Sequence, residues 1–356
     1  MWKGPRGDGR SARVVVALVA ALTLGTSLAG PAFADEEQTQ FDQVKAQFAW
    51  TAWADSRPVS PFFGIPFEFT LGAPFSRSFL DSTPGRAEAF ASFYYGDDTI
   101  EETYESSGYK NATLARCNFP DIGRGTEKEY APAGPSGPRA WVKTPNRTEA
   151  NSEARDGVAT DPLATGGWAK TRAVFNRQDR ITAETAGAAY GLKLPNGVTI
   201  GAIDSMVQVE QRLGAEPLIS YRISLVDVRT TDGQELVGVG DKAITLMGTK
   251  VAGRDLADQF NQQAREHGGT LQAVAAKLSL HLVEPRIDKQ DNGAYYVAGP
   301  VFEIRSDNTP RKNQAGDNVG LRLGYTRTYT YLIGVGAGED QPAGGSGTST
   351  TARAGN

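Results

Sequence analysis

The densest group of side chains that could do chemistry is a short acidic run in the first third of the chain. Asp97 and Asp98 are followed closely by Glu101 and Glu102. Neighbouring carboxylates can bind a calcium ion, and a pair of them can act as acid and base in glycoside hydrolysis. The run lacks the regular ligand spacing of a calcium loop, and charge runs at strand ends are usually solvated. We therefore expect a solvated segment, with calcium binding and an exported hydrolase as the alternatives.

The chain offers few other reactive groups. Its one cysteine, Cys117, cannot form an intramolecular disulfide, and its two histidines, His267 and His281, lie in no recognisable catalytic or metal-binding motif. We expect Cys117 to be a half-buried small residue, with a reactive thiol or a bridge between two chains as alternatives. No serine nucleophile elbow or phosphate-binding glycine loop is present. These features predict no catalytic residue, no metal ion and no cofactor, and hence a protein that is not an enzyme.

Aromatic side chains are the best candidates for ligand binding. Most of them follow one another early in the chain, and one lies on a segment with helical periodicity. Such side chains can line an apolar pocket or form a platform for a sugar or a lipid, but they also fill hydrophobic cores. Core packing is the simpler expectation. The candidate ligand-binding residues are Phe48, Trp50, Trp53, Phe67, Phe69 and Phe260.

Composition restricts the class of partner. Hydrophobic residues make up 39% and charged residues 22% of the 356 residues, which is ordinary for a globular chain. The formal net charge is −4, and it includes a basic N-terminal segment, so the rest of the chain is more acidic still. This balance argues against nucleic acid as an electrostatic partner. A component of the cell envelope or an apolar small molecule remains as a possible partner.

The N-terminal segment has the pattern of an export signal. Basic residues precede the uncharged, mostly apolar run 14–28, and Ala32-Phe33-Ala34 supplies the small residues of a cleavage site. The apolar run is shorter than the roughly 20 residues that span a bilayer. Residues 1–34 are therefore predicted to be a cleavable signal peptide, with an uncleaved anchor as the alternative. The mature chain would begin at Asp35, without a stable membrane span, and be secreted or associated with the cell surface.

The remaining sequence is typical of a mainly β protein. Alternating apolar and polar residues predict strands, and Leu256, Phe260 and Ala264 recur at helical spacing, which predicts one packed α-helix over residues 255–267. We expect a large twisted antiparallel sheet or two β layers. The predicted strands cover 86–95, 168–177, 181–194, 198–209, 218–228, 278–282, 294–304 and 319–335, with two short strands within 236–247.

Proline and glycine suggest how the chain is divided. The prolines at 58, 61, 66 and 74 predict that the early strands are short or lie at a sheet edge. The Pro- and Gly-rich segment 123–140 is predicted to be a linker or irregular excursion. The predicted organisation is a signal peptide at 1–34, an N-terminal β region at 35–122, this linker, a main β domain at 141–335 and a disordered tail at 336–356.

Two stretches carry a resemblance to other proteins. One is Arg86-Ala-Glu-Ala-Phe-Ala-Ser-Phe-Tyr-Tyr-Gly-Asp-Asp98, and the other runs from Gly197-Val-Thr-Ile-Gly-Ala-Ile-Asp-Ser205 through 218–228 to the helix after Arg254. Together they resemble a group of uncharacterised exported proteins of high-GC Gram-positive bacteria. The resemblance implies a secreted or cell-surface location and a β-rich fold, and it assigns no functional residue.

Taken together, the residues favour a secreted or cell-surface protein that acts by binding or assembly rather than by catalysis. The alternative is an extracytoplasmic carrier of an apolar ligand such as a lipid, because a curved sheet closed by an amphipathic helix can enclose an apolar pocket.

Overall fold

The computed structural model describes most of the chain between residues 31 and 335. The described residues are 31–62, 74–92, 114–120, 126–131, 138–156, 164–194, 197–249, 254–266, 280–305 and 320–335. The chain divides into two units, Met1–Gln40 and Phe41–Asn356. The fold described below is that of the second unit.

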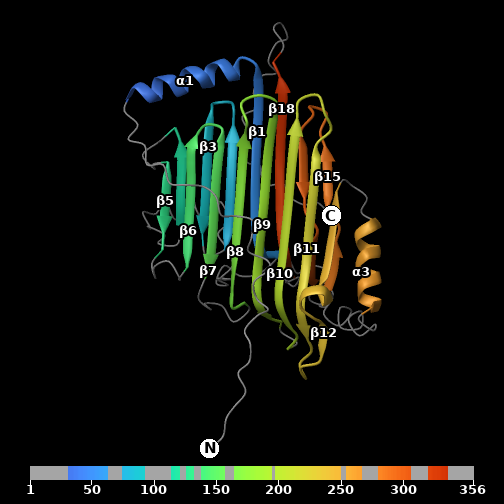
Figure 1. The fold of residues 1–356 in the computed structure, drawn as a ribbon. Coiled ribbons are helices and arrows are strands. Elements are labelled where there is room, and N and C mark those ends of the chain that lie inside the picture. The colour runs from blue at the N-terminus through green and yellow to red at the C-terminus, as the bar shows by residue number, and fades with distance from the viewer. Residues whose placement is uncertain are drawn as a thin grey trace, which may run out of the picture. The chain divides into compact units, whose positions relative to one another are not determined.

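The described strands form two antiparallel sheets, as the sequence predicted for a mainly β protein (Figure 1). Sheet A has the order β14-β17-β18-β1-β2-β3-β4, and β16 also pairs with β18 and with β15. Its strands are β1 (Phe48–Phe62), β2 (Phe75–Asp81), β3 (Arg86–Ser92), β4 (Leu114–Phe119), β14 (Leu280–Val283), β15 (Arg286–Lys289), β16 (Tyr295–Ala298), β17 (Val301–Arg305) and β18 (Gly320–Gly334).

Sheet B is built from the middle of the chain. Its order is β12-β11-β10-β9-β8-β7-β6-β5, and β13 pairs with β11. Its strands are β5 (Glu127–Tyr130), β6 (Arg139–Asn146), β7 (Glu149–Asp156), β8 (Gly166–Phe175), β9 (Arg180–Lys193), β10 (Thr199–Arg212), β11 (Leu218–Arg229), β12 (Glu235–Val237) and β13 (Ile244–Thr249), and the short 3₁₀ turn η1 (Gly240–Lys242) precedes β13.

The two sheets pack face to face, so the two-layer form of the prediction is the one found. The hydroxyl of Ser56 on β1 donates to the backbone carbonyl of Ala186 on β9 over 2.8 Å. Trp50 on β1 stacks on Phe175 of β8, with ring centroids 4.3 Å apart. In Figure 1 the long strands of the two sheets run in the same general direction, which is the aligned packing of β-sandwiches.

The chain enters and leaves the fold in the middle of sheet A. β1 pairs with β18 from Phe48 opposite Gly334 to Phe62 opposite Gly320. The chain therefore forms half of sheet A, crosses to build all of sheet B, and returns to complete sheet A. The predicted N-terminal region 35–122 thus shares its sheet with the end of the predicted main domain.

The prediction that proline keeps the early strands short or at an edge is wrong for β1. This strand has 15 residues and lies between β18 and β2. However, β1 pairs with β2 only from Thr51 to Ser56. Pro58 and Pro61 follow, where β18 is the one described partner of β1, so a proline nitrogen without a hydrogen can be tolerated there.

The predicted linker at 123–140 also needs correction. Glu127–Tyr130 within it form β5, which pairs with β6, and β6 itself begins at Arg139. β5 is short and carries Glu127, Lys128 and Glu129, a composition that suits an edge strand because charges discourage pairing with another chain. The described residues 127–130 of this segment are therefore a strand at a sheet edge.

The described part of the chain contains two α-helices, one predicted and one not. α3 (Arg254–Glu266) matches the predicted helix and lies along β13 at the edge of sheet B (Figure 1). The amides of Gln259 and Gln263 hydrogen-bond the backbone of Met247 and Thr245, so the helix covers an otherwise open strand edge. α1 (Pro31–Lys45) was not predicted, although proline suits the first position of a helix.

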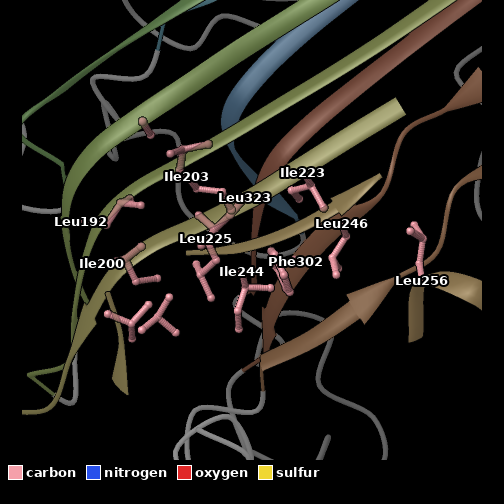
Figure 2. Packing of buried hydrophobic residues seen from close by; sticks show 14 of the residues in the cluster. Leu192, Ile200, Ile203, Ile223, Leu225, Ile244, Leu246, Leu256, Phe302 and Leu323 are labelled. Carbon is pink, nitrogen blue, oxygen red and sulfur yellow. The ribbon is translucent and has the colours of Figure 1, made fainter. Parts of the chain in front are cut away.

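The interior between the sheets contains two kinds of packing. One hydrophobic cluster consists mainly of leucine, isoleucine and valine from β9, β10, β11 and β13, joined by Leu256 of α3, Phe302 of β17 and Leu323 of β18. Figure 2 shows these side chains pointing toward one another. The other cluster surrounds Trp50 and Phe175 and is otherwise rich in alanine. The predicted shared face of β11 is confirmed: Ile219, Tyr221, Ile223 and Leu225 are all buried.

Candidate binding surface on the outer face of sheet A

The aromatic residues proposed as ligand-binding residues divide between the inside and the outside of the sandwich. Trp50 is fully buried and stacks on Phe175, and Phe48 packs edge-on against the same ring at 5.9 Å. Phe260 of α3 packs on Phe302 at 5.7 Å, beside the aliphatic cluster. These three rings therefore contact the core. Trp53 differs, because it lies on the opposite face of β1.

Several predicted site residues lie outside the described residues. These are Phe67, Phe69 and the four acidic residues Asp97, Asp98, Glu101 and Glu102. Among the residues that the structure does describe, no group of three or more histidine, cysteine or acidic side chains is placed to hold a metal ion. Cys117 is fully buried rather than half-buried; burial raises the pKa of its thiol, and Thr144 donates a hydrogen bond to its sulfur over 3.4 Å.

The outer face of sheet A carries a row of aromatic residues around Trp53. The strand register places Tyr296 of β16 opposite Tyr329 of β18, Tyr329 opposite Trp53, and Trp53 opposite Phe79 of β2. The rings of Trp53 and Tyr329 are nearly parallel, with centroids 6.2 Å apart, and Tyr296 lies 5.9 Å from Trp53. All four side chains are partly exposed. We call Tyr296, Tyr329, Trp53 and Phe79 the aromatic row.

An arginine cluster lies directly beside this row. Asp55, two residues after Trp53 on β1, is fully buried and accepts hydrogen bonds from three guanidinium groups. Arg327 donates from Nε and Nη2 to Oδ2 over 2.8 and 2.6 Å, Arg57 donates to both carboxylate oxygens over 3.2 Å, and Arg77 donates to Oδ2 over 3.5 Å. Because Arg327, Asp55 and Arg77 are register partners on β18, β1 and β2, the sheet itself brings them together.

The electrostatics of Asp55 follow from this arrangement. Burial by itself would raise the pKa of its carboxyl, but the charges of Arg57, Arg327 and Arg77 outweigh burial and hold the pKa well below its usual range. Burial lowers the pKa of Arg327, and the charge of Asp55 more than compensates, so that pKa is raised. A carboxylate that holds its negative charge so firmly is a poor general base near neutral pH. Asp55 is thus poorly suited to proton transfer near neutral pH.

The three arginines of the cluster also contact aromatic rings. The guanidinium of Arg327 lies over the ring of Trp53 at 5.3 Å and over Tyr325 at 5.6 Å. Arg57 and Arg77 lie over the ring of Phe75 at 4.8 and 5.4 Å. The side chains of Arg327 and Arg77 are 27% and 26% exposed, so both retain contact with solvent. Cation–π contacts of this kind fix the direction of each guanidinium.

The outer face of sheet B provides a contrast. Its charged side chains include cross-strand pairs, such as Arg222 with Asp204 at 2.7 Å and Lys143 with Glu127 at 3.0 Å. Each of these side chains is more than a quarter exposed. It also carries one aromatic pair, in which the indole nitrogen of Trp168 donates to the hydroxyl of Tyr190 over 2.7 Å. The nearest parallel among the described residues of this face is Glu210, which is 18% exposed and pairs with Arg180 at 3.5 Å and Arg212 at 2.7 Å; no carboxylate described there pairs with three arginines.

Sequence reasoning identified Trp53 but missed the rest of the surface. A signal was present in each strand, since Trp53, Asp55 and Arg57 alternate on β1 and Tyr325, Arg327 and Tyr329 alternate on β18. What the sequence did not show is that these two strands, 272 residues apart between Asp55 and Arg327, are neighbours.

The chain was compared with protein-family models and with curated proteins. No protein-family model matches it, and no curated protein matches it significantly. No helix in the described part of the chain is long and apolar enough to cross a membrane.

Proposed function

We propose that this protein is exported and acts without catalysis, by binding an acidic polysaccharide of the cell envelope on the outer face of sheet A. The observation that carries the proposal is the aromatic row beside partly exposed arginines. Sugar rings present apolar C–H faces that pack on aromatic rings such as Trp53 and Tyr329. The carboxylates or sulfates of an acidic sugar accept paired hydrogen bonds from planar guanidinium groups such as those of Arg77 and Arg327.

Export is part of this proposal and rests on the sequence and on the stated resemblance. Cleavage after Ala34 would leave Phe41 in place, and that side chain is buried against Trp50 with ring centroids 5.6 Å apart. The guanidinium of Arg147 lies over the ring of Phe41, 5.0 Å from its centroid. A mature chain beginning at Asp35 would thus retain these contacts. The mass of the protein recovered from culture medium would test the cleavage position.

Binding can be tested by affinity electrophoresis of residues 35–356 in gels that contain polygalacturonate, an acidic polysaccharide, or dextran, a neutral one. We expect retardation by polygalacturonate and little by dextran. Trp53→Leu should weaken retardation about tenfold in apparent Kd, which corresponds to about 1.4 kcal/mol. The matched control is Trp168→Leu on the outer face of sheet B, which should bind as the wild type does.

The control also defines failure. An equal loss in Trp53→Leu and Trp168→Leu, with both proteins folded by circular dichroism, would exclude sheet A as the binding face. Equal retardation by dextran would still agree with sugar binding on the aromatic row. It would contradict the proposal that the arginines recognise acidic groups of the polysaccharide. No retardation by either polymer, or by cell-wall polysaccharide isolated from the producing cells, would contradict the proposal as a whole.

The carrier of an apolar ligand has less support than this surface. Its proposed lining included Phe48, Trp50 and Phe260, whose rings contact Phe175 or Phe302 in the core. Those contacts are the ones expected of core residues. Native mass spectrometry of the exported protein would still distinguish the two ideas, because a stoichiometric apolar adduct would favour the carrier.

A further inference from the structure

Hydroxyl groups form a band across the inner faces of the two sheets, in the middle of the sandwich. At the β2, β7 and β8 end they bond to one another and to the backbone. Thr171 contacts the hydroxyls of Ser76, Ser78 and Ser152 at 3.0, 2.9 and 2.8 Å. Nearer the centre, Thr185 donates to the backbone carbonyl of Asp55 over 2.9 Å. The hydroxyl groups at this end of the band therefore have their hydrogen-bond partners within the protein.

The other end of the band has no such partners. Thr326, Thr328 and Thr330 alternate along β18 and so share its inner face, and Ser205 lies on β10, which packs against β18. Their exposed fractions are 1%, 0%, 0% and 2%. Among the described residues, none offers a hydrogen bond to these four hydroxyl oxygens.

The four hydroxyls belong to one continuous stretch. The side chain of Ser205 lies beside Gly324, two residues before Thr326: a Cβ added to Gly324 would be 3.1 Å from that of Ser205. Thr326 lies against Gly299, where an added Cβ would be 2.5 Å from its hydroxyl oxygen. The facing positions on β1 are Ala52 and Ala54, opposite Thr330 and Thr328. On the other side of β18, β16 places Tyr295 and Val297 opposite Thr330 and Thr328, so the small neighbours of the row lie on its β1 side.

We propose that this row is an internal hydration site, in which ordered water molecules bridge Ser205, Thr326, Thr328 and Thr330. A buried hydroxyl without a hydrogen-bond partner costs about 1–3 kcal/mol of folding free energy. Four such hydroxyls in one row would therefore destabilise the folded protein strongly. Buried water commonly makes about three hydrogen bonds to polar groups of this kind. Aliphatic side chains at the same positions would fill the same volume without burying a polar group. A polar ligand that hydrogen-bonds the hydroxyls would explain why they are present.

The test compares Thr328→Val with Thr171→Val. Valine has nearly the shape of threonine and lacks the hydroxyl. If water bridges the row, Thr328→Val removes a partner from that water and should lower Tm by about 2 °C. If the row is dry, the same change removes an unsatisfied group and should raise Tm. Thr171→Val must lower Tm in either case, because its hydroxyl has protein partners, and it shows that the measurement detects one lost hydroxyl.

A crystal structure of residues 35–356 at high resolution gives the direct answer. We expect solvent peaks within hydrogen-bonding distance of the hydroxyls of Thr326, Thr328 and Thr330. A rise in Tm for Thr328→Val, or well-ordered side chains with no solvent beside them, would overturn the proposal. Neither result depends on what the outer face of sheet A binds.

Discussion

The outer faces of the two sheets use similar residues in opposite ways. On sheet A three arginines converge on one buried carboxylate, Asp55, next to a row of aromatic rings. On sheet B the described charges form smaller groups, such as the exposed pair of Arg222 with Asp204 and the two arginines, Arg180 and Arg212, that share Glu210. The difference shows that the count of charged residues says little about function. What matters is whether strand pairing concentrates the charges in a place sheltered from water, because water weakens exposed pairs strongly.

The largest expected effect comes from removing the shared carboxylate. Asp55→Ala leaves three guanidinium groups close together without the anion that holds them, and should cost about 3–5 kcal/mol of the free energy of unfolding. The matched change on sheet B, Asp204→Ala, should cost less than about 1 kcal/mol. Urea denaturation of both variants checks this. Similar costs for the two changes would remove the distinction between the faces.

The next largest effect is the loss of stability in acid that Asp55 on sheet A should cause. The pKa of Asp55 is held low in the folded protein, so the unfolded chain binds the proton more tightly. The stabilisation from Asp55 is therefore complete above the unfolded pKa of about 3.9 and is lost as the pH falls below it. We expect the stability of the wild type to fall more steeply with acid than that of Asp55→Asn. Urea denaturation near neutral pH and at about pH 3 measures the two slopes, and parallel slopes would contradict the expectation.

A smaller effect tests the geometry of the arginines. Arg327 donates to Asp55 from two nitrogens of one planar group, which a lysine ammonium cannot reproduce. Arg327→Lys should therefore cost about 1–2 kcal/mol although it keeps the charge. Arg222→Lys on sheet B should change stability by less than about 0.5 kcal/mol. Thermal unfolding of both variants is sufficient, and an unchanged Tm for Arg327→Lys would show that charge alone matters there.

Salt should produce the smallest difference. At 1 M salt the screening length falls to about 3 Å, which weakens exposed ion pairs more than buried ones. A double-mutant cycle for Arg222 and Asp204 should lose most of its coupling energy, which starts below about 1 kcal/mol. The same cycle for Arg327 and Asp55 should retain most of its value. If both couplings vanish in salt, Asp55 is not sheltered from solvent as its burial indicates.

Local patterns predicted much of the fold and part of the candidate surface. The alternation of Ile219, Tyr221, Ile223 and Leu225 predicted both a strand and its buried face, because side chains alternate across a sheet whatever its neighbours are. The spacing of Leu256 and Phe260 predicted α3 in the same way. Trp53 was identified as a candidate, but the sequence assigned it to the same group as Trp50, which lies on the other face of β1.

The errors arose where the neighbours of a strand decide the outcome. Pro58 and Pro61 predict a limit on β1, yet β1 continues through them where β2 no longer pairs with it. Residues 127–130 have too few apolar side chains to predict a strand, and they form one because β6 supplies the hydrogen bonds. Pairing between strands is a long-range property, and no single segment records it.

The sequence alone determined the β class of this protein, the position of its packed helix and the inward face of its most regular strand. Each of these follows from a local period, because the backbone geometry of a helix or a strand fixes which side chains share a face. Only the tertiary structure decided that β1 pairs with β18, that Asp55 meets Arg77 and Arg327, and that Thr326, Thr328 and Thr330 are enclosed between the sheets. Register and layer packing join residues far apart in the chain, and the alternation within each strand is compatible with many such partners.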